Sequence, residues 1–90
     1  MIHKKILIKG HVQGVGFRYA ARSIARQLGI KGFVRNLPDG SVYVEAEGSE
    51  KQIQDFINWC HIGPPRAHIN SVVTENGEIK GYSDFDILPH

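Results

Sequence analysis

The sequence predicts an α+β sandwich in which two helices cover one face of a mainly antiparallel sheet. Two segments repeat apolar residues at helical spacing, and both are surrounded by short strand-like runs and by turns that contain Gly and Pro. The resulting order is β-α-β-β-α-β plus a C-terminal strand. The 90 residues, of which 41% are hydrophobic and 22% charged, are enough for one core, so we expect a single domain over residues 1–90.

The first half begins with a strand predicted at residues 5–9, where lysines flank three apolar residues. A glycine-rich loop leads from this strand into a helix that begins at Phe17. That helix ends before Gly29, because glycine suits the left-handed conformation at a helix C-terminus. Residues 32–37 form the second strand. The apolar face of the helix consists of Phe17, Ala20, Ala21, Ile24, Ala25 and Leu28.

The second half contains three further strands. The Pro-Asp-Gly turn at residues 38–40 predicts a hairpin into a strand at 41–47. Every second residue of that strand is apolar, so we expect it to be half-buried, with its polar residues facing away from the core. Strands at 69–74 and 83–88, separated by an Asn-Gly turn at 76–77, complete the sheet.

The second helix follows the third strand. Ser49 and Gln52 have the spacing of a capping box, which predicts a helix that begins after Ser49 and runs to about His61. Gly-Pro-Pro at 63–65 ends it. Cys60 falls on the apolar face of this helix, so we interpret it as a small core residue.

This order of elements is that of a ferredoxin-like sandwich, in which a strand–helix–strand unit is repeated around a hairpin. Right-handed crossovers place the ends of the first two strands at the same edge of the sheet. The glycine loop leaves the first strand there, and Asn36 lies near the end of the second. We therefore expect Arg18, the loop and Asn36 to meet at one site.

The glycine loop, residues 10–18, reads Gly-His-Val-Gln-Gly-Val-Gly-Phe-Arg and opens the first helix. Backbone N–H groups of a loop and a helix N-terminus are free to bind an anion, and the helix dipole favours negative charge there. Arg18 opposes that dipole unless an anion lies between them. The pattern predicts a phosphate cradle whose backbone donors are Gln13, Gly14, Val15, Gly16 and Phe17.

The charges are divided unevenly along the chain. Residues 1–38 contain eight basic and no acidic residues, whereas residues 39–90 contain nine acidic and three basic ones. Arg18, Arg22 and Arg26 follow one another at i, i+4 spacing, which destabilises an isolated helix slightly. Either the acidic half neutralises the basic half across the fold, or the basic half binds an anion.

Two segments resemble the signatures of the acylphosphatase family. Residues 8–18 are similar to the first signature, and Gly-Phe-Val-Arg-Asn at 32–36 is similar to the second. The resemblance implies a ferredoxin-like hydrolase of acyl phosphates in which Arg18 is the catalytic, phosphate-binding residue and Asn36 orients the attacking water. Related domains begin larger hydrogenase-maturation carbamoyltransferases, but those tend to carry proline where this chain has Tyr19, which favours a free-standing enzyme.

The chemistry of an acyl phosphate agrees with these residue types. Its leaving group is a carboxylate, which departs without a general acid, so charge neutralisation and water positioning are what the site must supply. Asn36 is a poor proton acceptor, which leaves the substrate phosphate as the final base. The histidines lack ligand spacing and no carboxylate precedes Asp39, so we expect no metal and no cofactor.

Two other functions stay open: a ferredoxin-like nucleic-acid-binding module and a non-catalytic interaction module. RNA-recognition modules share this fold but stack bases on aromatic residues, and here the strand at 41–47 carries acids. We expect an acyl phosphate and inorganic phosphate as ligands, with no nucleic-acid partner, and a monomer. One cysteine, no signal-like segment and no long apolar run favour a cytoplasmic protein that does not contact membranes.

Overall fold

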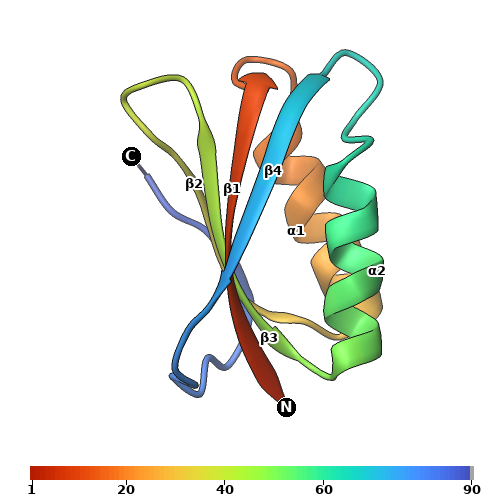
Figure 1. Ribbon diagram of the computed structural model, residues 1–90, viewed down its shortest axis with the longest axis vertical. Helices are drawn as coiled ribbons and strands as arrows, with labels where there is room; N and C mark the ends of the chain where they lie inside the picture. Colours follow the sequence, from red (N-terminus) through yellow and green to blue (C-terminus); the bar gives the residue numbers. More distant parts are fainter. Residues whose placement is uncertain (90) are drawn as a thin grey trace.

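A computed structural model describes residues 1–89 and confirms the ferredoxin-like sandwich, with both helices on one face of a five-stranded sheet (Figure 1). The sheet order is β4-β1-β3-β2-β5. β5 is parallel to β2, and the other neighbours are antiparallel. His90 lies outside the described residues. The elements are β1 (Ile2–His11), α1 (Phe17–Leu28), β2 (Lys31–Asn36), β3 (Val42–Gly48), α2 (Glu50–Cys60), β4 (His68–Asn76) and β5 (Phe85–Ile87).

Both helices begin and end as predicted. α1 ends at Gly29, whose φ of 78° is left-handed and whose N–H reaches the carbonyls of Ala25 and Arg26. α2 begins after Ser49, whose side chain accepts from the Gln52 N–H while the Gln52 side chain accepts from the Ser49 N–H. Local sequence signals therefore fix these helix termini.

The core lies between the helices and the sheet. Cys60 is fully buried in it, as expected, and burial raises the pKa of its thiol. The Trp59 ring packs 5.2 Å from Phe17 and 6.0 Å from Phe56, centroid to centroid, which joins α2 to α1. The largest fully buried apolar side chains are Phe17, Phe56, Phe85, Ile6, Ile8, Ile30 and Ile53.

Some strands differ in length from those predicted, most clearly β1 and β5. β1 spans Ile2–His11 instead of residues 5–9, and β5 spans Phe85–Ile87 instead of 83–88. The turn predicted at residues 76–77 does not form a hairpin, because β4 continues through Asn76 and β4 and β5 lie at opposite edges of the sheet. Backbone pairing extends β1 beyond its apolar residues, whereas β5, at the edge of the sheet, pairs with β2 over three residues and is shorter than predicted.

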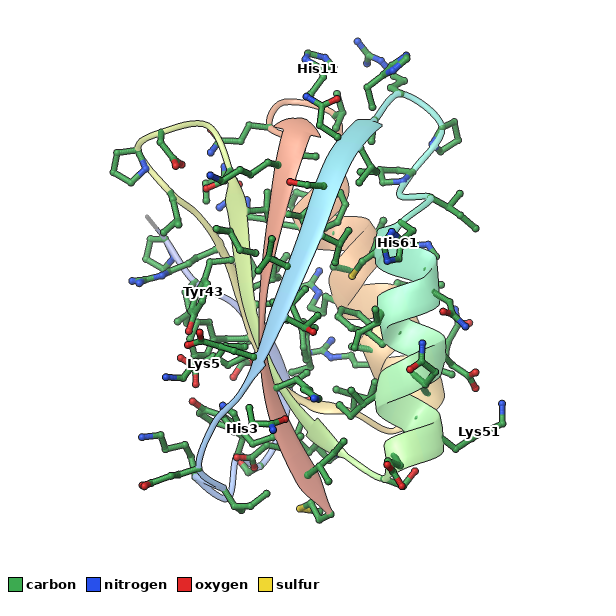
Figure 2. All side chains as sticks on the ribbon, viewed as in Figure 1. His3, Lys5, His11, Tyr43, Lys51 and His61 are labelled. Atoms are coloured by element: carbon green, nitrogen blue, oxygen red, sulfur yellow. The ribbon has the colours of Figure 1, made fainter. Side chains whose placement is uncertain are left out.

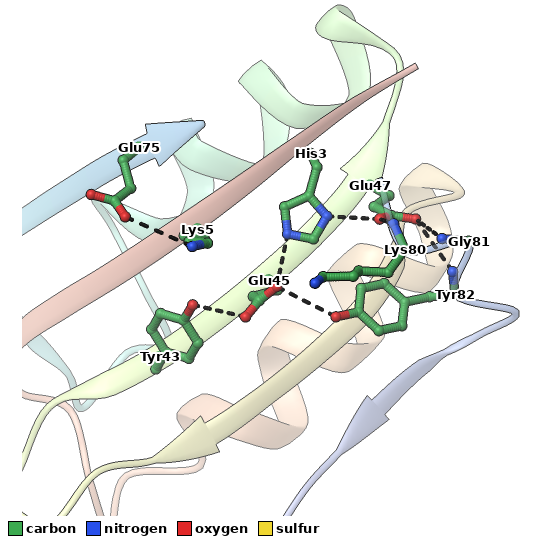
Figure 3. Close-up of polar contacts among 9 residues, drawn as sticks. All are labelled: His3, Lys5, Tyr43, Glu45, Glu47, Glu75, Lys80, Gly81 and Tyr82. Atoms are coloured by element: carbon green, nitrogen blue, oxygen red, sulfur yellow. Dashed lines mark hydrogen bonds and ion pairs between the residues drawn. The ribbon is translucent and has the colours of Figure 1, made fainter. Parts of the chain in front are cut away.

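The expectation that residues 41–47 are buried on one face alone was wrong at Glu47, which is 1% exposed, and at Ser41, which precedes β3 and is 3% exposed. Glu47 faces away from the helices but is covered by His3 and by residues 80–82 (Figure 3). Its carboxylate accepts from the N–H groups of Lys80, Gly81 and Tyr82. Burial alone would raise the pKa of Glu47, but these bonds and the one from His3 outweigh it and lower the pKa.

His3 is the centre of this network. Its Nδ1 lies 2.7 Å from Glu47 and its Nε2 lies 2.8 Å from Glu45, and the ring is 2% exposed. Tyr43 and Tyr82 also donate to Glu45. Both ring nitrogens of His3 therefore have a carboxylate partner within hydrogen-bond distance, one on each side of the ring. The His3–Glu45–Glu47 network thus fastens the segment before β5 onto the face of the sheet that the helices leave open.

Candidate active site

A small cavity lies where β1 and β2 end. Figure 1 shows the β1–α1 loop and the β2–β3 turn at the same end of the sheet, and His11, the last residue of β1, marks that end in Figure 2. The cavity has a volume of about 160 Å³. The topology therefore brings Arg18, the glycine loop and Asn36 together, as the crossover rule predicts. The lining residues are Val12, Gln13, Gly14, Gly16, Phe17, Arg18, Tyr19 and Asn36.

The N-terminus of α1 has no side-chain cap. Gly16 precedes the helix with φ 80° and ψ 17°, and no acidic residue occupies the first turn. Gly14 is also left-handed, with φ 74°, so a side chain at either position would strain the loop. α2 provides the contrast, with a complete capping box and Glu50 in its first turn. The first turn of α1 thus leaves N–H groups without side-chain acceptors beside the cavity.

Arg18 adds a full positive charge to this helix terminus. Among residues 1–89, no carboxylate lies within 4.0 Å of its guanidinium nitrogens. Two turns further along the same helix, Arg26 pairs with Asp84 at 3.1 Å and with Asp86 at 4.0 Å. Neutralisation across the fold therefore accounts for Arg26. It does not account for Arg18, which lines the cavity.

Asn36 enters the cavity from the last position of β2. It is 8% exposed and is fixed by its pairing with Val42 of β3. The turn that follows is held by Asp39, which accepts from the N–H and hydroxyl of Ser41, as a turn residue should. The Ser41 hydroxyl is the main reason that the pKa of Asp39 lies below its ordinary value. An ordered hairpin thus follows Asn36, which lines the same cavity as Arg18.

The Gln13 side chain connects the loop to this hairpin. Its amide nitrogen donates to the carbonyl oxygens of Leu37 at 2.8 Å and Ser41 at 2.9 Å. The sequence pattern predicts Gln13 only as a backbone donor, and this side-chain contact was not predicted. The polar side chain between glycines was a signal, but its partners lie more than twenty residues away and depend on the tertiary fold.

Val15 and Tyr19 are the other differences from the predicted site. The Val15 side chain belongs to the core and does not line the cavity, so its role as a backbone donor stays a prediction. Tyr19 lines the cavity although the sequence analysis assigned it no function there. Within residues 1–89, no three His, Cys, Asp or Glu side chains are grouped as a metal site, and no helix is long and apolar enough to cross a membrane.

A larger cavity of about 370 Å³ lies on the face of the sheet opposite the helices, where Figure 2 labels Lys5 and Tyr43. Its lining is largely apolar, and its Lys5 and Glu75 form an ion pair at 4.0 Å. It includes neither a helix N-terminus nor a cation without an acidic partner. The smaller cavity therefore has the groups that chemistry on an anion needs.

The fold and this cavity define a ferredoxin-like domain with a small polar site at the end of its sheet. A family model described as Acylphosphatase matches residues 4–87, and the chain belongs to the acylphosphatase family. The acylphosphatase of Archaeoglobus fulgidus is 47% identical over 87 residues, which are 97% of this chain and 98% of that protein. The acylphosphatase of Thermotoga maritima is 48% identical over 83 residues, 92% of each chain.

Solved structures agree with this family membership. The acylphosphatase of Bacillus subtilis superposes with a TM-score of 0.95 at 32% identity and covers 98% of this chain and 99% of its own. Full-length HypF in a phosphate- and nucleotide-bound form gives a TM-score of 0.86 at 37% identity, but the match covers 97% of this chain and 12% of the HypF chain. The fold is thus found both as a small protein and as part of a larger one.

Proposed function

We propose that this chain hydrolyses the carboxyl–phosphate bond of acyl phosphates to a carboxylate and inorganic phosphate, and that Arg18 and Asn36 carry the reaction. The observation that carries the proposal is their convergence in one cavity with the uncapped N-terminus of α1. Family membership supports the hydrolase activity. The roles of the individual residues follow from what each group can do at that position.

Arg18 and the loop bind the phosphoryl group. A guanidinium offers a planar fork that holds two phosphate oxygens, and the N–H groups of residues 13–17 bind the remaining oxygen. Phosphoryl transfer passes through a loose transition state with charge on these oxygens, so fixed donors stabilise it. The hydrogen bonds of the Gln13 side chain to Leu37 and Ser41 fix the position of the glycine loop relative to the hairpin that follows Asn36.

Asn36 holds the attacking water in line with the bond that breaks. The water oxygen forms a bond to phosphorus while the bond from phosphorus to the acyl oxygen breaks, and its electron pair leaves on the carboxylate. The proton lost by the water passes to a phosphate oxygen, because the Asn36 amide does not accept it. No step needs a nucleophilic side chain or a general acid.

The test is hydrolysis of benzoyl phosphate by the purified protein, by two variants of Arg18 and by a control variant of Arg26 on the same helix. Arg18→Ala should abolish turnover and phosphate binding with the fold intact, and Arg18→Lys should be nearly as damaging because an ammonium has no bidentate fork. Arg26→Ala removes an arginine two turns away that is paired with Asp84, and it should stay active. Phosphate binding is followed by NMR titration. An Arg18→Ala protein that binds phosphate as the parent does contradicts the proposal.

A further inference from the structure

Tyr19 follows Arg18 in the first turn of α1 and lines the same cavity. Its side chain is 66% exposed, although tyrosine is large and partly apolar. The Arg22 guanidinium carbon lies 5.5 Å from the centre of the Tyr19 ring, a cation–π contact that holds the ring in place. An exposed aromatic ring is therefore fixed at the mouth of the candidate site.

The residues that line the cavity decide what can reach this ring. With the phosphoryl group held by Arg18 and the loop, and the water held by Asn36, as proposed above, the acyl group lies against the remaining lining residues. Val12 and Phe17 also line the cavity, but they are 2% and 1% exposed and belong to the core. Tyr19 is the lining side chain that offers exposed apolar area to an acyl group.

We infer that Tyr19 determines specificity, because its ring contacts the acyl group of the substrate and favours aromatic or extended apolar acyl phosphates over acetyl phosphate. This inference rests on the proposed function and names the substrate class of that site. Aromatic rings pair edge-to-face or in offset stacks, and a small acetyl group gains little from either arrangement. Arg22 positions the ring and does not itself need to touch the substrate.

The experiment compares kcat/KM for benzoyl phosphate and acetyl phosphate in the parent protein and in Tyr19→Ala, Tyr19→Phe and Val73→Ala. In Tyr19→Ala the preference for benzoyl phosphate should fall about two- to tenfold, mainly through a higher KM for benzoyl phosphate. Tyr19→Phe keeps the ring and should restore the preference. Val73→Ala is the matched control, because it truncates a 57% exposed apolar residue that does not line the site.

Inhibition by inorganic phosphate separates a contact with the acyl group from an effect on the cradle. Phosphate has no acyl group, so its inhibition constant should be the same in Tyr19→Ala as in the parent. An unchanged preference in Tyr19→Ala, or a loss of phosphate inhibition parallel to the loss of benzoyl phosphate turnover, overturns the inference. If the parent protein cleaves neither substrate, the proposed function fails together with the inference. If the parent cleaves both substrates and Tyr19→Ala has the same preference between them, only the specificity role of Tyr19 fails.

Discussion

Glu47→Ala should destabilise the protein strongly without changing its catalytic rate. The substitution removes one partner of the buried His3 and leaves the N–H groups of Lys80, Gly81 and Tyr82 without their acceptor. Each buried polar group that is left without its partner costs about 1–3 kcal/mol. Residues 80 and 81 are exposed and can recover bonds to water, so the cost comes mainly from the buried His3 and the half-buried Tyr82, and we expect a loss of about 3 kcal/mol.

That loss is large for a domain whose unfolding free energy is about 5–15 kcal/mol. In a domain of this size it corresponds to a Tm lower by at least about 12 °C. Urea denaturation at pH 7 measures the free energy, and thermal unfolding checks it. Glu75→Ala is the matched control, since this glutamate is 73% exposed and 4.0 Å from Lys5, and it should change stability by less than about 0.5 kcal/mol.

The catalytic rate should be unaffected well below the Tm because Glu47 lies at the other end of β3 from the site. Glu47 pairs with Lys31 at the start of β2, whereas Val42 pairs with Asn36 at its end. A destabilisation below about 1 kcal/mol, equal to that of Glu75→Ala, would show that the network contributes little. A fall in kcat at low temperature would show that it is coupled to the site.

The same network predicts how stability depends on pH. Burial acts to raise the pKa of Glu45 and of Glu47, but hydrogen bonds outweigh it and both values lie below about 4.5. A carboxyl whose pKa is lower in the folded state stabilises the protein above its unfolded pKa and loses that contribution as the pH falls through the folded value. Unfolding free energies measured from pH 7 to pH 3 should therefore fall below about pH 4.5. Glu47→Gln, which cannot ionise, should flatten that fall.

Other predictions concern the site itself. Asn36→Ala should lose kcat while phosphate affinity changes little, with stability changed by about 1 kcal/mol or less, and retained kcat would remove Asn36 from the mechanism. Gln13→Ala and Gln13→Glu both lose the amide donor to Leu37 and Ser41, so each should lower kcat and cost about 1–2 kcal/mol in denaturation. Without a general acid, the rate should follow the stability of the leaving group, so cleavage should be fast for benzoyl phosphate, slower for p-nitrophenyl phosphate and slowest for an alkyl phosphate. EDTA should have no effect. Equal rates on the three substrates, or activity lost to EDTA and restored by a divalent cation, would reveal a further catalytic group.

Local signals explain which features the sequence predicts. The capping box at Ser49, the left-handed Gly29 and the spacing of apolar residues in α1 each depend on residues within a few positions, so the pattern alone locates both helices. The convergence of Arg18 and Asn36 needs one more step, the handedness of the crossover, which is nearly invariant. The predicted site therefore required no knowledge of side-chain packing.

The His3 network was not predictable in the same way because it depends on strand register. His3 lies directly opposite Glu47 in the β1–β3 pair, and forty-four residues separate them in sequence. A shift of one residue would turn His3 to the other face and leave Glu47 buried without its partner. The cover over Glu47 comes from residues 80–82, a loop without periodicity. Alternation correctly assigns Glu47 to the face away from the helices but does not indicate that this face is covered.

Polar groups have protein partners at one end of the sheet and lack them at the other. At the His3 end each carboxylate and ring nitrogen finds a protein partner, which stabilises the fold. At the loop end, α1 has an arginine in an uncapped first turn, and left-handed glycines precede it; each of these features destabilises a helix or loop on its own. An anion in the cavity would relieve the repulsion at Arg18 and accept from the N–H groups that lack side-chain acceptors. Under the proposed function, these unfavourable features of the α1 N-terminus keep its donors available for a phosphoryl group.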